Sequence, residues 1–321
     1  MLNIIYIFGN NIKDKVNLQK NSIYKKKQIK FSKKIFKKIE KTKKLKNIFR
    51  DYIKTFVETL IDRNANFDFS NCMKNIKNLN IIVLTGDKQM NCKGKFVLDE
   101  NTIYINENSL SKTQDTIFHE LFHMASFNHS KKIAGGFQHG FTYEGINEGY
   151  TQLLTNKYFK NSTNHFEIET EFALLLEFII GSQLMEKLYS TANISALLNE
   201  IGKYNENNQD YASSFLKQID DFRLICYLPA NEFTSEKRDE LIKILKNIMI
   251  GFIEMFVNKL KLEKIDIGIE KFFSHLIYKI KTKNEVHLIL SSQEIDKYKI
   301  TCYKSIEIDK QTKLYSKINK K

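Results

Sequence analysis

Two histidines stand four residues apart in this sequence, at His119 and His123, and Glu120 directly follows the first of them. Residues at this spacing lie one turn apart on the same face of an α-helix, so both imidazoles can reach a single metal ion. Glu120 then projects toward the water bound to that ion. The pattern predicts a helix through residues 119–123 that carries half of a zinc site.

The residues before this helix predict a small sheet. Three short runs rich in β-branched and aromatic residues are typical of strands, and turn-forming residues join the second and third into a hairpin: 80–85, 95–98 and 102–106. Ser111 and Gln114 have the spacing of a capping box, in which each side chain satisfies a free N–H at the start of a helix. We therefore expect the helix to begin there and to run to about Ser126.

The rest of the sequence predicts mainly helices. The expected elements are a glycine-containing loop at 134–140, helices at 147–158 and 166–189, further helices to about residue 282, strands at 286–290 and 298–308, and a Lys-rich tail. The longest apolar runs are interrupted by Glu177 and Glu254, so we expect buried helices and no transmembrane segment.

A catalytic zinc needs a third protein ligand, and Glu148 is the first candidate. It lies 25 residues after His123 in the string Ile146-Asn-Glu-Gly-Tyr150, which is similar to the Leu-Asn-Glu-Gly-Phe of aminopeptidase N-type enzymes. Over about residues 80–190 the chain resembles the gluzincin metallopeptidases, in which HExxH is followed by a second helix with an Asn-Glu pair. The resemblance implies Glu148 as third ligand. Gln152 stands where the thermolysin-type enzymes have an Asp that orients a histidine, so a different acceptor is expected here.

Two other histidines are alternative third ligands. His129 follows His123 by six residues, which is the spacing of the metzincin pattern HExxHxxGxxH. That pattern needs a glycine where this chain has Ser126, because the helix must end there in a left-handed conformation. His139, in the glycine-containing loop, is a weaker alternative. Glu148 is therefore favoured over both.

The same resemblance assigns roles in catalysis. Zinc lowers the pKa of its bound water, and Glu120 acts as general base and later passes the proton to the leaving amine. An inactive, metal-binding relative would have no chemical reason to keep Glu120. Related enzymes supply a further donor to the developing oxyanion from a downstream Tyr or His. Tyr189 is the first candidate, and the others are Tyr143, Tyr150, His139 and His165.

The net charge of +14 is concentrated in the first 50 residues, which hold 15 lysines and only two acidic residues. Apolar residues recur there every three or four positions, which predicts one amphipathic helix over about residues 22–62. A basic helix can bind nucleic acid or an anionic membrane surface, alone or as the arm of a DNA-associated protease. Arginine suits phosphate contacts better than lysine, and the chain has only four, which favours a solvated helix instead.

These features predict an α+β fold in three parts. Residues 1–65 form a basic amphipathic helical segment, residues 66–190 a zincin-like core with a small mixed sheet over the active-site helix, and residues 191–321 a mainly helical subdomain ending in short strands. The N-terminus has neither a basic region ahead of its apolar residues nor a small-residue cleavage site, so we expect a cytoplasmic chain.

The resemblance also implies the cofactor and the substrate. The expected cofactor is Zn²⁺, and the expected partner is a peptide or protein held as an added strand along the sheet edge at Thr102–Asn106. Nothing in the chain matches the run that clamps the N-terminal amine in aminopeptidases. We therefore expect an endopeptidase.

Overall fold

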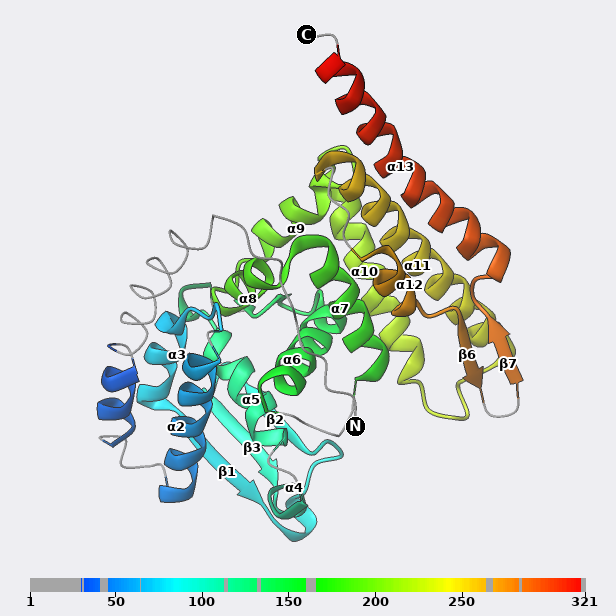
Figure 1. Cartoon of the computed structure of the whole chain (residues 1–321). Helices are drawn as coiled ribbons and strands as arrows, with labels where there is room; N and C mark the ends of the chain where they lie inside the picture. Colours follow the sequence, from blue (N-terminus) through cyan, green and yellow to red (C-terminus); the bar gives the residue numbers. More distant parts are fainter. Residues whose placement is uncertain are drawn as a thin grey trace.

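The computed structural model describes residues 30, 32–40, 46–63, 65–112, 115–131, 134–159, 166–263, 268–282 and 285–318. These residues form a mixed α+β fold that is mostly helical, which confirms the predicted class (Figure 1). Its helices are α2 (Asn47–Asp62), α3 (Phe69–Asn75), α4 (Glu107–Lys112), α5 (Asp115–Ser126), α6 (Glu144–Phe159), α7 (Glu167–Ile180), α8 (Ser182–Ser190), α9 (Ile194–Lys203), α10 (Gln209–Cys226), α11 (Ser235–Glu263), α12 (Ile269–Ser274) and α13 (Ser292–Ile318). Its strands are β1 (Asn80–Leu84), β2 (Gly94–Val97), β3 (Thr102–Asn106), β4 (Ala134–Gly135), β5 (Gln138–His139), β6 (Lys279–Thr282) and β7 (Glu285–Leu288).

The largest sheet has the strand order β1-β3-β2, and the helix α5 packs against β2 and β3. β1 runs parallel to β3, whereas β2 and β3 form the predicted antiparallel hairpin. All three predicted strands are therefore confirmed. The predicted edge is wrong, however, because Thr102–Asn106 is the central strand and its hydrogen-bonding groups are used on both sides. The edge nearest α5 is β2.

The helix α5, which carries HExxH, is surrounded by aromatic side chains. The ring of Phe122 lies 4.9 Å from that of Phe56 in α2, and the ring of Phe118 stacks 4.0 Å from that of Phe159 in α6. α5 begins at Asp115 and not at the expected capping box: Ser111 lies inside the short helix α4, and Gln114 lies outside the described residues. The aromatic contacts of Phe118 and Phe122 determine which face of α5 lies toward α6.

The prediction of one continuous helix over residues 22–62 is wrong, because the helix is interrupted at Lys46. Residues 32–40 are helical, but Lys46 is extended and α2 begins only at Asn47, with the Lys46 carbonyl accepting from the N–H of Phe49. Residues 22–29, 31 and 41–45 lie outside the described residues. Both helical segments bury their apolar face in the common core, Ile35 and Ile39 included.

The predicted helix over residues 166–189 is two helices. α7 ends at Ile180 and α8 begins at Ser182, because Gly181 adopts a φ of +99°, which interrupts the helical path and which side chains with a Cβ rarely adopt. α7 crosses α6 closely at Gly149, where a Cβ would collide with the backbone carbonyl of Glu169. The residue after Glu148 must therefore be small for these helices to pack.

Two further expectations differ from the structure. The segment 134–140 contains the small hairpin β4–β5, although it was expected to be a loop. Residues 298–308 belong to the helix α13, and not to strands. Their buried and half-buried side chains recur at helical spacing against α11, at Ile295, Tyr298, Cys302 and Ile306. The strand expected at 286–290 is confirmed as β7, paired with β6.

The buried apolar residues form one core cluster that extends from Ile35 to Ile306. α10 packs on α6 as well as on α9 and α11, so the C-terminal helices contact the helix that carries Glu148. In the described part of the chain, no helix has both the length and the apolar character needed to cross a membrane.

Candidate metal centre

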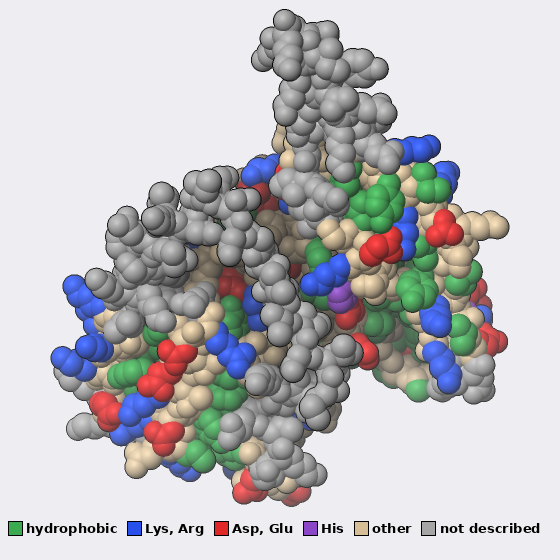
Figure 2. Space-filling model, in the orientation of Figure 1, with side chains coloured by type: hydrophobic (Ala, Val, Ile, Leu, Met, Phe, Trp, Pro, Cys, Tyr) green, Lys and Arg blue, Asp and Glu red, His purple; other side chains and the backbone are tan. Residues whose placement is uncertain are grey.

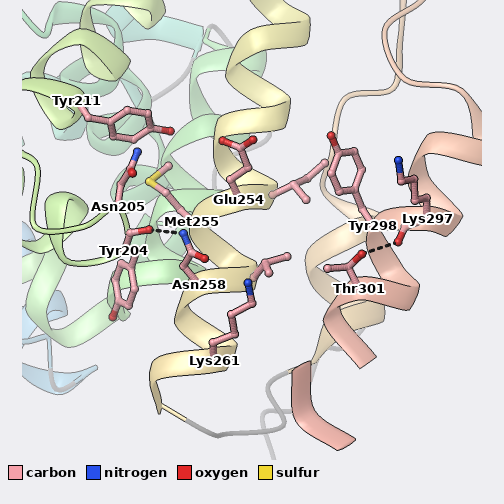
Figure 3. A pocket seen from close by; sticks show the side chains of 12 residues that line it. Tyr204, Asn205, Tyr211, Glu254, Met255, Asn258, Lys261, Lys297, Tyr298 and Thr301 are labelled. Carbon is pink, nitrogen blue, oxygen red and sulfur yellow. Dashed lines mark hydrogen bonds between the residues drawn. The ribbon is translucent and has the colours of Figure 1, made fainter. Parts of the chain in front are cut away.

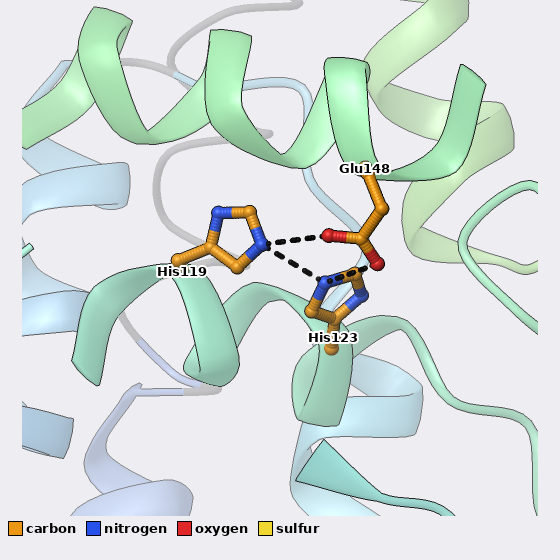
Figure 4. Close-up of side chains that lie close together, drawn as sticks. All are labelled: His119, His123 and Glu148. Atoms are coloured by element: carbon orange, nitrogen blue, oxygen red, sulfur yellow. Dashed lines mark hydrogen bonds and ion pairs between the residues drawn. The ribbon is translucent and has the colours of Figure 1, made fainter. Parts of the chain in front are cut away.

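The structure brings His119, His123 and Glu148 together, between α5 and α6 (Figure 4). Nε2 of His119 lies 3.1 Å from Nε2 of His123 and 3.1 Å from Oε2 of Glu148, and Nε2 of His123 lies 3.4 Å from Oε1 of Glu148. A tetrahedral zinc with bonds of about 2 Å separates its ligand atoms by about 3.3 Å. The three side chains therefore present their ligand atoms at the separations that such an ion requires.

The fit extends to the protonation of the ligands. Burial disfavours the charge of Glu148, but the charge of His123 and the hydrogen bonds from both histidines outweigh it and hold the pKa of Glu148 well below its usual value. Burial likewise opposes the charged form of His123, yet Glu148 raises the pKa of His123. Both shifts favour a proton held on His123 beside an ionised Glu148, and a metal that bound there would compete with that proton.

Glu120 lies beside this cluster and is not part of it. It is buried at 6% exposure, and its Oε2 accepts a hydrogen bond of 2.7 Å from the backbone N–H of Phe96 in β2. Burial raises the pKa of Glu120, as a general base that must accept a proton requires. The close approach of β2 depends on Gly94, because a Cβ there would lie 2.6 Å from Thr116 and 3.3 Å from Glu120 itself.

Neighbouring side chains orient the two imidazoles. The carboxamide of Asn147 accepts the N–H of Phe137 at 2.9 Å and places its nitrogen 3.5 Å from Nδ1 of His123. The ring of His119 stacks on that of Phe166, with 5.6 Å between centroids. Gln152 instead donates to Asn156. The Asn147 nitrogen is itself a donor, so Asn147 in this orientation does not supply the acceptor that was expected for a ligand histidine.

The N-terminus of α6 is held by a distant residue, Asp220 of α10. Its carboxylate accepts the backbone N–H groups of Tyr143 at 2.5 Å and of Gly145 at 2.8 Å. These N–H groups have no partner within α6 itself, and a carboxylate also interacts favourably with the positive end of the helix dipole. Asp220 therefore fixes the start of the helix four residues before Glu148.

The other predicted site residues are placed elsewhere. His129 is exposed in a 3-10 turn (His129–Lys131), and His139 is exposed in β5, so neither joins the cluster. Tyr189 is fully buried, its hydroxyl is 2.6 Å from that of Thr151, and it does not line the cleft, so the structure does not support it as an oxyanion donor. The hydroxyls of Tyr143 and Tyr150 bond to Ser213 and Glu177, respectively. His165 lies outside the described residues.

The cluster opens into a cleft of about 1000 Å³. One side is formed by β2 and the residues before it and the other by α6 and α10, and Gln138, Gly140 and Phe141 also line the cleft. Arg223 of α10 and the adjoining Tyr227 line the cleft and were not predicted from the sequence. A second pocket of about 260 Å³ lies among the α9–α10 turn, α11 and α13, contains no histidine and is separate from this site (Figure 3).

Arg223 joins several parts of the cleft. Its guanidinium lies 3.2 Å from Glu144 of α6 and 3.3 Å from Glu169 of α7, between the rings of Phe166 and Tyr227 at 5.1 and 4.7 Å. Burial opposes its charge, but the nearby carboxylates, Glu148 first among them, raise the pKa of Arg223. It remains a cation in the wall of the cleft.

Comparisons with known proteins add no assignment: no family model, no curated protein and no solved structure matches this chain.

Proposed function

We propose that this protein is a zinc-dependent peptidase. The observation that carries the proposal is the arrangement of His119, His123 and Glu148 at zinc-ligand separations, with a buried Glu120 beside them, at the bottom of an open cleft. When bound, zinc would supply Lewis-acid polarisation of the scissile carbonyl and acidify the attacking water. Glu120 takes the proton of that water and passes it to the nitrogen of the leaving amine. The HExxH motif at residues 119–123, the Asn147-Glu148 pair and the distances between their side chains support the proposal of a zincin-like core.

The edge strand β2 is the part of the cleft that suits a peptide backbone. The N–H of Phe96 points away from β3 toward Glu120. In an antiparallel pair the N–H and C=O of one residue point the same way, so the C=O of Phe96 and the polar groups of Gly94 also face the cleft. We propose that an extended peptide pairs with β2 through the C=O of Phe96 and the polar groups of Gly94, and presents its scissile bond to Glu120, which already accepts the N–H of Phe96. An endopeptidase remains the preferred reading.

The proposal is tested by separating metal binding from chemistry. Purified protein should contain about one zinc per chain by elemental analysis, and His123→Ala should lose it. Glu120→Gln should keep the zinc and lose at least a hundredfold in peptide hydrolysis, because it removes only the base. Glu100→Gln, in the β2–β3 turn, is the surface control. Hydrolysis at the wild-type rate by Glu120→Gln would refute the mechanism.

Binding of a polyanion by the basic N-terminal residues is the second candidate; the lysines concentrated there motivate it, whereas the scarcity of arginine favours a solvated helix. On the face of the molecule drawn in Figure 2, basic and acidic side chains of the described residues are intermixed, which adds no support to it. Elution of the full chain from heparin in a salt gradient tests the proposal. Elution at low salt would remove it.

A further inference from the structure

The turn at residues 139–142 displays an aromatic ring, Phe141, that no residue of the described part of the chain covers. Phe141 is 99% exposed, more than any other large apolar residue that the structure describes, and it lines the cleft. Leaving a phenylalanine side chain in water forgoes about 2 kcal/mol relative to burying it. Exposure of this ring is therefore unfavourable in the isolated chain, and an apolar group bound against it would recover part of that free energy.

The turn that carries Phe141 is closed by its own hydrogen bonds. The backbones of His139 and Thr142 exchange hydrogen bonds of 3.2 and 3.1 Å, and the Thr142 hydroxyl donates to the carbonyl of His139. Gln138 donates to the carbonyl of Gly140, whose φ of +63° closes the turn. A turn closed in this way loses little conformational entropy when a ligand covers its exposed ring, and this lowers the free-energy cost of binding.

The turn is fastened to α10, which ends at the second exposed ring of the cleft. Tyr143 holds a φ of +63°, which is unfavourable for a residue with a Cβ; its N–H is bound by Asp220 and its hydroxyl lies 2.9 Å from that of Ser213. Tyr227 directly follows α10, is 56% exposed, and has the guanidinium of Arg223 over its ring. One helix thus positions both rings relative to each other.

We propose that Phe141 and Tyr227 form a subsite for a large apolar side chain of the peptide substrate. The proposal rests on the proposed peptidase function, because it takes the occupant of the cleft to be a peptide. Exposed aromatic rings that line a cleft are the type of residue that dominates recognition of apolar groups. The subsite adds a preference for Phe, Leu or Met over Ala, Lys or Glu at one position of the substrate.

Peptide binding to zinc-loaded Glu120→Gln full-length protein tests the subsite without turnover. The probes are fluorescent decapeptides of one sequence in which a single Phe, Ala or Lys is moved through each position. At one position the Phe peptide should bind at least about tenfold tighter than the Ala peptide. Adding Phe141→Ala or Tyr227→Ala should reduce this preference to about threefold or less, whereas Tyr227→Phe should keep it, because the ring and not the hydroxyl makes the contact.

Leu224→Ala is the matched control, since Leu224 is 69% exposed on the same helix and does not line the cleft. It should leave the preference unchanged. Equal binding of the Phe, Ala and Lys peptides, or an equal loss with Leu224→Ala, would overturn the subsite. Hydrolysis by the wild-type protein is measured separately: cleavage without an apolar preference refutes the subsite alone, whereas a Phe preference in binding without any cleavage refutes the peptidase and keeps the subsite.

Discussion

The helix α6 packs on α5 on one side and on α10 on the other, and only the contribution of α5 can be recognised in the sequence. On one side, α5 contributes the two histidines of the candidate metal site, whose spacing is fixed by the helix itself. On the other side, α10 contributes Asp220, Arg223 and the following Tyr227, which cap α6 and line the cleft. The comparison shows that the histidine pair of the candidate site is set by a single helix, whereas the support of α6 depends on residues about 75 positions downstream.

The largest expected effect concerns the ligands. Glu148→Gln should weaken zinc binding by at least about a hundredfold, because it replaces an anionic ligand with a neutral amide. His129→Ala should leave zinc content and hydrolysis near wild type, because that side chain is exposed and outside the cluster. Titration with a competing zinc chelator measures both. The opposite pattern would mean that the ligand set is of the metzincin kind.

An intermediate effect is expected where α10 supports α6. Asp220→Asn leaves one oxygen for two backbone N–H groups, so the free energy of unfolding should fall by about 1–2 kcal/mol and zinc affinity by about tenfold. Asp221→Asn, at the exposed neighbouring position, should change neither. Urea unfolding and chelator competition are the measurements. Unchanged zinc affinity in Asp220→Asn would show that α6 holds Glu148 in place without α10.

The smallest effect is expected at α13, which packs on α11 and not on the metal site. Glu294 accepts from the N–H of Ser291 and from Lys246, and these contacts lower the pKa of Glu294 from 4.5 to about 2. A lowered pKa means that the folded state gains stability above about pH 4.5 and loses it as the pH falls toward 2. Glu294→Gln should therefore be slightly less stable than wild type at pH 7, and the difference should disappear near pH 2.

The control for this prediction is Asp296→Asn, an exposed position on the same helix. Asp296→Asn should have the same free energy of unfolding as wild type at pH 7. Glu294→Gln should leave zinc affinity unchanged. A loss of zinc affinity in Glu294→Gln would show that α13 also influences the metal site, and that this influence is not confined to α10.

The sequence predicts those features whose physical cause is local. The strands β1–β3 follow from short runs of β-branched residues, and the meeting of His119 with His123 follows from the helical repeat. The break at Gly181 was missed because a single glycine is tolerated inside many helices, and only its φ of +99° shows that this one ends α7. Residues 298–308 were misassigned because their β-branched side chains also suit a helix packed on a neighbour.

The role of α10 could not be predicted for a different reason. Ser213, Asp220, Arg223 and Tyr227 recur at spacings of seven, three and four, which is the repeat of one helical face. Polar residues at that spacing are typical of any amphipathic helix, so nothing marks them as partners of Tyr143 or Glu144. Likewise, the edge position of β2 depends on which strand lies in the middle of the sheet. Such information exists only in the tertiary fold.

The carboxylate of Asp220 also determines the order in which this protein can be completed during synthesis. Gly145 leaves the ribosome 75 residues before its partner does, which corresponds to roughly 4–15 seconds at a rate of about 5–20 residues per second. Residues 115–159, which form α5 and α6 in the finished fold, are made before most of that interval has passed, while the N–H groups at the start of α6 still lack the Asp220 carboxylate. A nascent chain of this protein therefore contains His119, His123 and Glu148 before it contains the Asp220 that caps the helix carrying Glu148.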